Sequence, residues 1–376
     1  MNQQAASREF SSCLPDIPTL TGRAPGNLSL LPGLAWSVAL AELAIRLGSI
    51  SWLQSHGMSA LTVAIVLGIV FGNTLYPRFS ANSDAGVNFS KQTLLRAGVI
   101  LYGLRLTLHD IGQVGMASVL IDALVLTSTF ALALILGTRL FGLDHSTSML
   151  IGAGSAICGA AAVMATVPVV RAKTEQVTVA VSTVVVFGTL AIFLYPALYN
   201  LNLQWLVPAG PKAFGIYAGS TIHEVAQVFA AGRSISADTG NTAVITKMVR
   251  VMMLAPFLIG LSTWMARKKI GAKDAMATDG AKNGLTIPWF AFGFVSVVIF
   301  NSLSLLPLHV IGAAVNLDSF LLAMAMAALG LTTQVSSIRR AGIKPLLLGG
   351  LLFAWLIGGG GLINNVVSSF LVHPVN

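Results

Sequence analysis

Long apolar runs alternate with short polar turns along most of the chain. A helix needs about 20 apolar residues to cross a bilayer, and runs near that length occur at 33–50, 58–76, 91–107, 115–138, 147–170, 175–199, 212–232, 243–266, 287–306, 317–333 and 343–370. The turns between them are short, apart from a basic segment at 266–284. The pattern predicts an all-α polytopic membrane protein with about nine to eleven transmembrane helices.

Composition agrees with a lipid environment. The 376 residues are 55% hydrophobic and only 9% charged, with a mean hydropathy of +0.81, whereas soluble domains carry roughly 25% charged residues. This excludes a soluble enzyme or a protein that reads nucleic acid, so the net charge of +9 is not a DNA footprint. Residues 1–30 are polar and contain no signal peptide. We expect a disordered tail, followed by one transmembrane domain over 31–376.

The two cysteines lie in different settings. Cys13 belongs to the polar tail and Cys158 to an apolar run. No disulfide is therefore expected between them, metal-ligand spacing is absent, and we expect neither a bound metal nor a cofactor.

Basic residues predict the orientation but leave two topologies open. With a cytoplasmic N-terminus, the cytoplasmic loops would hold Arg78, Lys91, Arg139, Lys212, Arg267, Lys268, Lys269, Lys273, Lys282, Arg339, Arg340 and Lys344. The loops predicted outside, 47–57 and 307–316, contain no Lys or Arg, as the positive-inside rule requires. Arg171 and Lys173 would then fall outside. If 147–170 and 212–232 are re-entrant hairpins, these two return to the cytoplasm, but Lys212 and Arg233 move outside.

Two internal similarities predict inverted repeats. The segment "LLRAGVILYGLRLTLHDIGQVG" (94–115) aligns without gaps to "LLAMAMAALGLTTQVSSIRRAG" (321–342), and "IVFGNTL" (69–75) resembles "VIFNSL" (298–303). The second internal similarity is between "AGSAICGAAAVMA" (153–165) and "AGSTIHEVAQVFA" (218–230). Inverted repeats with discontinuous helices are common in secondary transporters. The second similarity therefore favours two broken or re-entrant segments, although chance similarity between small-residue helices gives the same pattern.

The candidate site lies on these two similar segments, 153–165 and 218–230. Small and polar residues there can expose backbone groups and hydroxyls to a solute; the predicted substrate-binding residues are Gly154, Ser155, Cys158, Gly219, Ser220, Thr221 and Gln227. His223 and Glu224 are ionisable groups inside an apolar run, where such groups usually face a cavity or a partner, and we predict that they couple transport to protons. The alternatives are close packing and hydrogen bonds that merely hold the helices together.

Other polar residues in the runs have weaker interpretations. Glu42 and Arg46 are expected to form an i,i+4 pair, and Asp122 is a candidate partner of Arg96 or Arg105. Those two arginines either attract an anion or extend to the headgroups. Three further residues could line a transport path: Thr332, Thr333 and Gln334.

Enzyme functions are weakly supported. The segment "HEVAQ" (223–227) begins like a zinc-protease motif, but Gln227 replaces the second histidine ligand. An intramembrane hydrolase that uses Ser155 and His223 remains the alternative function, although no G-x-S-x-G elbow is present. We do not expect an enzyme.

Several segments together resemble the YeiH-type bacterial inner-membrane proteins, a membrane protein family grouped as proposed sulfate exporters. They are "LLRAGVILYGLRL", "IGAGSAICGAAAV", "YAGSTIHEVAQVFAAG", "KMVRVMMLAPFL", "IPWF" and "LLAMAMAALGLTT". The resemblance covers about residues 30–370. It implies a transporter with inverted repeats and crossed, discontinuous helices, and only weakly a sulfate or sulfonate substrate.

These observations predict a secondary active transporter in the bacterial inner membrane, with a cytoplasmic N-terminus, that exports a small anion by alternating access. Its partners would be the anionic solute and the bilayer, without nucleic acid, and a homo-oligomer remains open. Proton coupling is the first expectation, and Na⁺ coupling is its rival.

Overall fold

The computed structural model describes residues 27–50, 53, 59–201, 208–270, 289–334 and 342–372. The elements assigned in this part of the chain are all helical. Most of the predicted tail lies outside the described residues, as do Cys13, Lys273, Lys282, Arg339 and Arg340.

The helices follow the predicted apolar runs closely. In chain order they are α2 (Asn27–Gly48), α4 (Ala60–Thr74), η1 (Tyr76–Arg78), α5 (Ser80–Phe89), η2 (Ser90–Leu94), α6 (Leu95–Tyr102), η3 (Gly103–Arg105), α7 (Leu108–Ile135), η4 (Leu136–Leu140), α8 (His145–Ala156), α9 (Ala160–Val170), α10 (Thr174–Asn200), α11 (Pro211–Thr221), α12 (Val225–Ile235), α13 (Ala237–Met252), α14 (Leu254–Ile270), α15 (Trp289–Ser302), α16 (Leu308–Thr332) and α18 (Ile343–Val372). Within the described residues, six helical segments are long and apolar enough to cross a membrane.

Two predicted boundaries are wrong. The span predicted at 317–333 begins at Leu308, so most of the predicted outer loop 307–316 is helical. The span predicted at 91–107 begins earlier, because α5, the π-helical turn η2 and α6 follow one another as a helical rod from Ser80. The polar start of this rod packs on α2, where a Cβ on Gly86 would collide with the Leu30 carbonyl oxygen. Small residues allow such close helix contacts. Lys91, predicted in a loop, therefore lies within this rod, in the π-helical turn.

Helices α8 and α9 form a re-entrant hairpin, which we call the first hairpin (145–170). Asp144 caps the start of α8, and its Oδ2 accepts a hydrogen bond of 2.7 Å from Gln176 Nε2, in the first turn of α10. The hairpin thus begins and ends at one face of the membrane. Its arms lie side by side, since a Cβ on Gly154 would approach Val163 Cγ2 to 2.7 Å.

Helices α11 and α12 form the second hairpin (211–235), which enters from the opposite face. A Cβ on Gly215 would lie 3.0 Å from Thr239 O and one on Gly232 would lie 3.4 Å from the same atom, so the outer ends of both arms meet the start of α13. The base of this hairpin lies at the far end of α10, where Phe214 packs on Tyr199 with ring centroids 5.0 Å apart. The re-entrant topology is therefore the one that the structure adopts.

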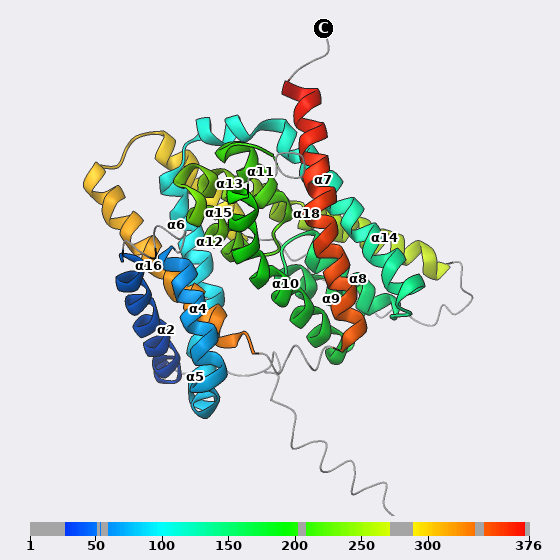
Figure 1. The fold of residues 1–376 in the computed structure, drawn as a ribbon, viewed down its shortest axis with the longest axis horizontal. Coiled ribbons are helices and arrows are strands. Elements are labelled where there is room, and N and C mark those ends of the chain that lie inside the picture. Colours follow the sequence, from blue (N-terminus) through cyan, green and yellow to red (C-terminus); the bar gives the residue numbers. More distant parts are fainter. Residues whose placement is uncertain are drawn as a thin grey trace, which may run out of the picture.

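Following the chain through these turns places a group of basic residues on one face. We call it the first face, where α2 begins; it lies at the bottom of Figure 1, opposite the C-terminus. Its basic residues in the described part are Arg78, Arg139, Arg171, Lys173, Arg267 and Lys344. Lys212 and Arg233 lie toward the second face, as the hairpin topology predicts.

The helices form two groups, which lie side by side in Figure 1. In the scaffold group, α2, α4, α5, α6, α15 and α16 contact one another; in the hairpin group, α7 to α14 and α18 do so. Contacts between the groups are much sparser and involve mainly α12, α13 and α7. The hairpins thus belong to a unit that is distinct from the scaffold.

The predicted inverted repeats are visible in the contacts. Asn73 Nδ2 donates to Thr333 O and Asn301 Nδ2 donates to Leu106 O, both over 2.9 Å. The two asparagines correspond in the alignment, as do the two acceptors. The glycines that end the two aligned segments also match, because Gly115 and Gly342 both have positive φ angles, 63° and 82°. In the first half of the chain the hairpin follows the aligned segments, whereas in the second half it precedes them. The two halves are therefore related by a circular permutation.

Candidate functional site

The tips of the two hairpins meet in the interior of the hairpin group at a buried lysine. Lys247, on α13, is 0% exposed, and its Nζ donates to Ile157 O and to Ile222 O over 2.6 Å each. These carbonyls occupy equivalent positions in the two similar segments, where α8 and α11 end. One ammonium group therefore joins both tips.

Arg250, one turn further along α13, repeats this arrangement. Its Nη2 donates to Ser155 O over 3.1 Å, its Nη1 donates to Ser220 O, and its Nε donates to Ala156 O over 2.7 Å. A helix C-terminus carries partial negative charge and unpaired carbonyls, which cations satisfy. Lys247 and Arg250 thus neutralise the inner ends of α8 and α11 deep in the membrane.

Sequence reasoning did not assign these two cations to the site. Lys247 and Arg250 lie three residues apart in the predicted span 243–266, so they share a helix face. Charged residues inside a span are costly and usually functional. That spacing was the available signal.

Glu224 lies where the returning helices of both hairpins, α9 and α12, begin. It precedes α12, and its backbone N–H donates to Gln227 Oε1, in the first turn of that helix, over 3.0 Å. Glu224 Oε1 accepts from Ala160 N, the first residue of α9, over 3.2 Å. Helix N-termini carry partial positive charge, so the Glu224 carboxylate is held by the N-terminus of α9, while Glu224 itself stands directly before α12.

Three of the predicted site residues keep buried polar atoms without a hydrogen-bond partner among the described residues. They are Ser155 Oγ, His223 Nδ1 and Gln227 Nε2. An unpaired buried polar group is expensive, and each one calls for an explanation such as a water or a ligand. These atoms give the tips unused capacity to bind a solute.

Small residues allow the tips to approach. Gly159 has φ 68°, and a Cβ there would collide with Glu224 Cγ. Gly219 lies against α13, where a Cβ would come within 2.7 Å of Thr246 Cβ. Gly154 packs similarly on α10, and Cys158 is 6% exposed at the first tip. The predicted small residues are therefore gathered around the junction, where close packing accounts for Gly154 and Gly219.

Two predicted hydroxyl groups are already engaged. Ser220 Oγ donates to Tyr217 O over 3.0 Å and accepts from Asn364 Nδ2 over 3.2 Å, and Thr221 Oγ1 donates to Tyr217 O. They stabilise the end of α11 rather than standing free for a ligand.

The chain is similar to known membrane proteins over most of its length. The family model described as "Conserved hypothetical protein 698" matches residues 32–349. The chain belongs to this family. It is 63% identical over 353 residues to the "UPF0324 membrane protein PA5383" of Pseudomonas aeruginosa, covering 93% of this chain and 98% of the relative. It is 58% identical over 341 residues to the "UPF0324 inner membrane protein YeiH" of Escherichia coli K12, with 91% and 95% covered. No solved structure matches.

The family resemblance inferred from the motifs is thus confirmed. Relatives are named inner membrane proteins, and the described helices include six long enough to cross a membrane. This member of the UPF0324 family is a multi-pass inner-membrane protein.

The hydrolase alternative requires a contact that this structure lacks. Ser155 Oγ has no hydrogen-bond partner among the described residues, and neither does His223 Nδ1. A serine nucleophile is activated by a base within hydrogen-bond reach. The geometry therefore does not favour a Ser155–His223 pair.

The remaining polar predictions have mixed outcomes. Arg46 Nε and Glu42 Oε1 form the predicted pair at 2.9 Å. Arg105, however, pairs with Asp318 at 2.9 Å instead of with Asp122. Asp122 is 0% exposed on α7, and neither of its carboxylate oxygens has a hydrogen-bond partner among the described residues. Periodicity could not choose between these acidic partners, because helix packing decides which residues meet.

The other predicted path residues lie away from the tips. Arg96 is exposed on α6. Thr332 and Thr333 donate their hydroxyls to Leu329 O at the end of α16, and Gln334 follows directly. They belong to the first face rather than to the hairpin junction.

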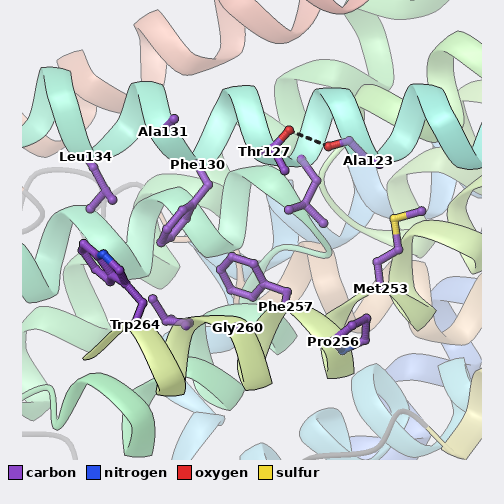
Figure 2. A pocket seen from close by; sticks show the side chains of 12 residues that line it. Ala123, Thr127, Phe130, Ala131, Leu134, Met253, Pro256, Phe257, Gly260 and Trp264 are labelled. Carbon is purple, nitrogen blue, oxygen red and sulfur yellow. Dashed lines mark hydrogen bonds between the residues drawn. The ribbon is translucent and has the colours of Figure 1, made fainter. Parts of the chain in front are cut away.

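A separate groove of about 610 Å³ lies between α7 and α14. Figure 2 shows aromatic and aliphatic side chains around it, including Phe130, Phe257 and Trp264. The Thr127 hydroxyl donates to Ala123 O within α7 over 2.7 Å. This apolar lining is unsuited to an anion, so the hairpin tips remain the candidate site.

Proposed function

We propose that the protein is a secondary active transporter that exports a small inorganic or organic anion, sulfate- or sulfonate-like in class. One observation carries the proposal. Two re-entrant hairpins enter from opposite faces, and their tips are joined at Lys247 and Arg250. Transporters commonly bind their substrates where discontinuous helices meet near the membrane midplane.

The chemistry of the tips supports an anionic substrate. The N-termini of α9 and α12 offer backbone N–H groups and partial positive charge, a recurrent anion site. On the two hairpins, the Gln227 amide nitrogen and the Ser155 hydroxyl are buried without partners among the described residues. Because these donors are neutral and fixed by packing, they suit a small anion that has lost its water.

Glu224, with His223, is the proposed proton-coupling group, because its carboxylate lies at the same helix N-termini. The proposal also includes export as the direction of transport and a cytoplasmic position for the first face. A cytoplasmic first face would carry the excess of Lys and Arg, in line with the positive-inside rule.

The first experiment screens the purified protein for thermal stabilisation by sulfate, sulfite, thiosulfate and taurine. An anion that binds the folded state raises its apparent stability, by about 2.7 kcal/mol at 100 times its Kd. Anions that stabilise are then tested for counterflow in proteoliposomes. A protein that none of them stabilises, and that shows no counterflow, contradicts the proposed substrate class.

The second experiment tests coupling. Glu224→Gln keeps a side chain of similar shape but cannot ionise, so we expect counterflow to lose its pH dependence while the protein still folds. Arg96→Gln, on the exposed side of α6, is the control. Unchanged proton-driven flux in Glu224→Gln would exclude Glu224 as the coupling group.

A further inference from the structure

The inner ends of α8 and α11 offer backbone carbonyl oxygens to a cation. Ile157 O and Ile222 O, at equivalent positions of the two similar segments, each accept from Lys247 Nζ over 2.6 Å. In transporters with broken helices, freed carbonyls and half-helix C-terminal ends coordinate the coupling ion. At this junction the ammonium group of Lys247 stands where such an ion would be bound.

The Lys247 ammonium group is bound by dipoles rather than by a carboxylate. Neither ion pair found among the described residues, one within α2 and one between η3 and α16, includes Lys247. Its two hydrogen bonds are short, as expected for a charged donor, and a helix C-terminus carries partial negative charge. The two carbonyl ends therefore recognise a positive charge of ammonium size, whether or not the chain itself carries it.

The side chain of Lys247 tethers this cation to α13. Lys247 is 0% exposed, and α11 lies directly against α13, because a Cβ on Gly219 would collide with the Ala243 carbonyl oxygen. One turn further along α13, Arg250 donates to other carbonyls of the same two helix ends. A cation that the chain carries cannot leave to either side of the membrane, so it cannot draw on an ion gradient.

We propose that the hairpin junction is a binding site for a monovalent cation and that Lys247 fills it permanently, so that the protein needs no Na⁺ there. Once the lysine side chain is removed, the site accepts a small alkylammonium ion or K⁺. The part that concerns transport rests on the proposed function, and it excludes Na⁺ bound at this junction as the coupling ion. The part that concerns the cation site does not depend on transport.

The first test is chemical rescue of Lys247→Ala. This variant keeps Cβ and lacks the rest of the side chain, which has the shape of propylammonium. Thermal unfolding of the purified variant is compared in the chlorides of propylammonium, methylammonium, K⁺ and Na⁺, with N-methylglucamine, which is too large for the vacated space, at the same ionic strength. We expect propylammonium to raise the apparent Tm above that in N-methylglucamine by about 5 °C at 100 times its Kd.

Three proteins serve as controls. The parent protein should not distinguish propylammonium from N-methylglucamine, because its site is filled. Lys247→Met fills the same space without a charge, so it should be destabilised and should not respond to propylammonium. Lys344 is exposed at the first face, so Lys344→Ala leaves the junction intact and should behave as the parent protein does.

Three outcomes overturn the cation site. The first is a Lys247→Ala protein that is equally stable in all the salts. The second is a Lys247→Met protein as stable as the parent, since the junction would then need no cation. The third is a response of Lys344→Ala as large as that of Lys247→Ala. If Lys247→Ala does not survive purification, the monodisperse fraction extracted from membranes in each salt replaces the Tm, and equal recovery in all the salts overturns the site.

Counterflow tests the part that concerns transport. In the parent protein its rate should be unchanged when N-methylglucamine replaces Na⁺, and a requirement for Na⁺ would overturn this part. An absence of counterflow with every anion contradicts the proposed function alone, because the rescue of Lys247→Ala reads the junction independently.

Discussion

At the residue scale, the hairpin junction is a balance of helix ends. The carbonyl ends of α8 and α11 face Lys247 and Arg250, and the N–H end of α9 faces Glu224. Each charge thus compensates helix termini that lipid could not solvate. This explains why a chain with few charged residues places three of them at one point.

Arg250→Met should destabilise the protein by about 3 kcal/mol or more, because charged hydrogen bonds contribute about 1.5–3 kcal/mol each and three carbonyls would lose a donor. Thermal unfolding in detergent, followed by size exclusion, measures the change. Arg46→Gln removes an arginine whose side chain is 77% exposed, and it should have little effect. Equal stability of the two variants would contradict the role of Arg250.

Gly159→Ala should cost about 1–3 kcal/mol, since its φ of 68° with ψ of −136° suits glycine and the new Cβ would push on Glu224. Gly358→Ala is the matched control, because a Cβ there meets nothing within 4 Å. The same unfolding assay compares them. A fully stable Gly159→Ala would mean that the first tip adopts another backbone conformation.

At the element scale, α8 and α9 form a hairpin of two short helices joined by a sharp turn. Composition alone would also allow one full span over the same residues. The Asp144–Gln176 hydrogen bond fixes this, since it ties the start of α8 to the start of α10. A full-span arrangement would place these residues at opposite faces.

Accessibility of single cysteines tests this topology. With native cysteines replaced by serine, Lys173→Cys should be labelled by an impermeant thiol reagent only from the face that also labels Arg78→Cys. Arg233→Cys should be labelled only from the other face. Labelling of Lys173→Cys and Arg233→Cys from the same face would contradict the opposed hairpins.

At the scale of the whole molecule, the sparse contacts between the scaffold and hairpin groups suit relative motion. One of them is a hydrogen bond from Tyr102 Oη to Asn241 Oδ1 over 2.6 Å. In the proposed transporter, movement of the hairpin group along the scaffold would expose the tips to each face in turn.

Cross-linking tests this movement. A bifunctional thiol reagent that joins Tyr102→Cys to Asn241→Cys should abolish counterflow, and a reductant should restore it. The control joins Asn73→Cys to Thr333→Cys, which lie within the scaffold group and contact each other. Full activity of the first cross-linked pair would contradict relative motion of the groups.

The sequence by itself determined the polytopic helical class, the helix order and the pairing of the two similar segments. It could do so because lipid imposes span length and because aligned residues such as Ile157 and Ile222 repeat a local pattern. It also predicted the Glu42–Arg46 pair, since i,i+4 neighbours are fixed by helix geometry alone.

Only the tertiary structure decided between spans and hairpins, because the basic residues on the loops fitted both topologies nearly equally. It also decided that Lys247 and Arg250 join the tips, and that Asp318 rather than Asp122 pairs with Arg105. These contacts join residues far apart in the chain, and the packing of whole helices, which no local pattern records, brings them together.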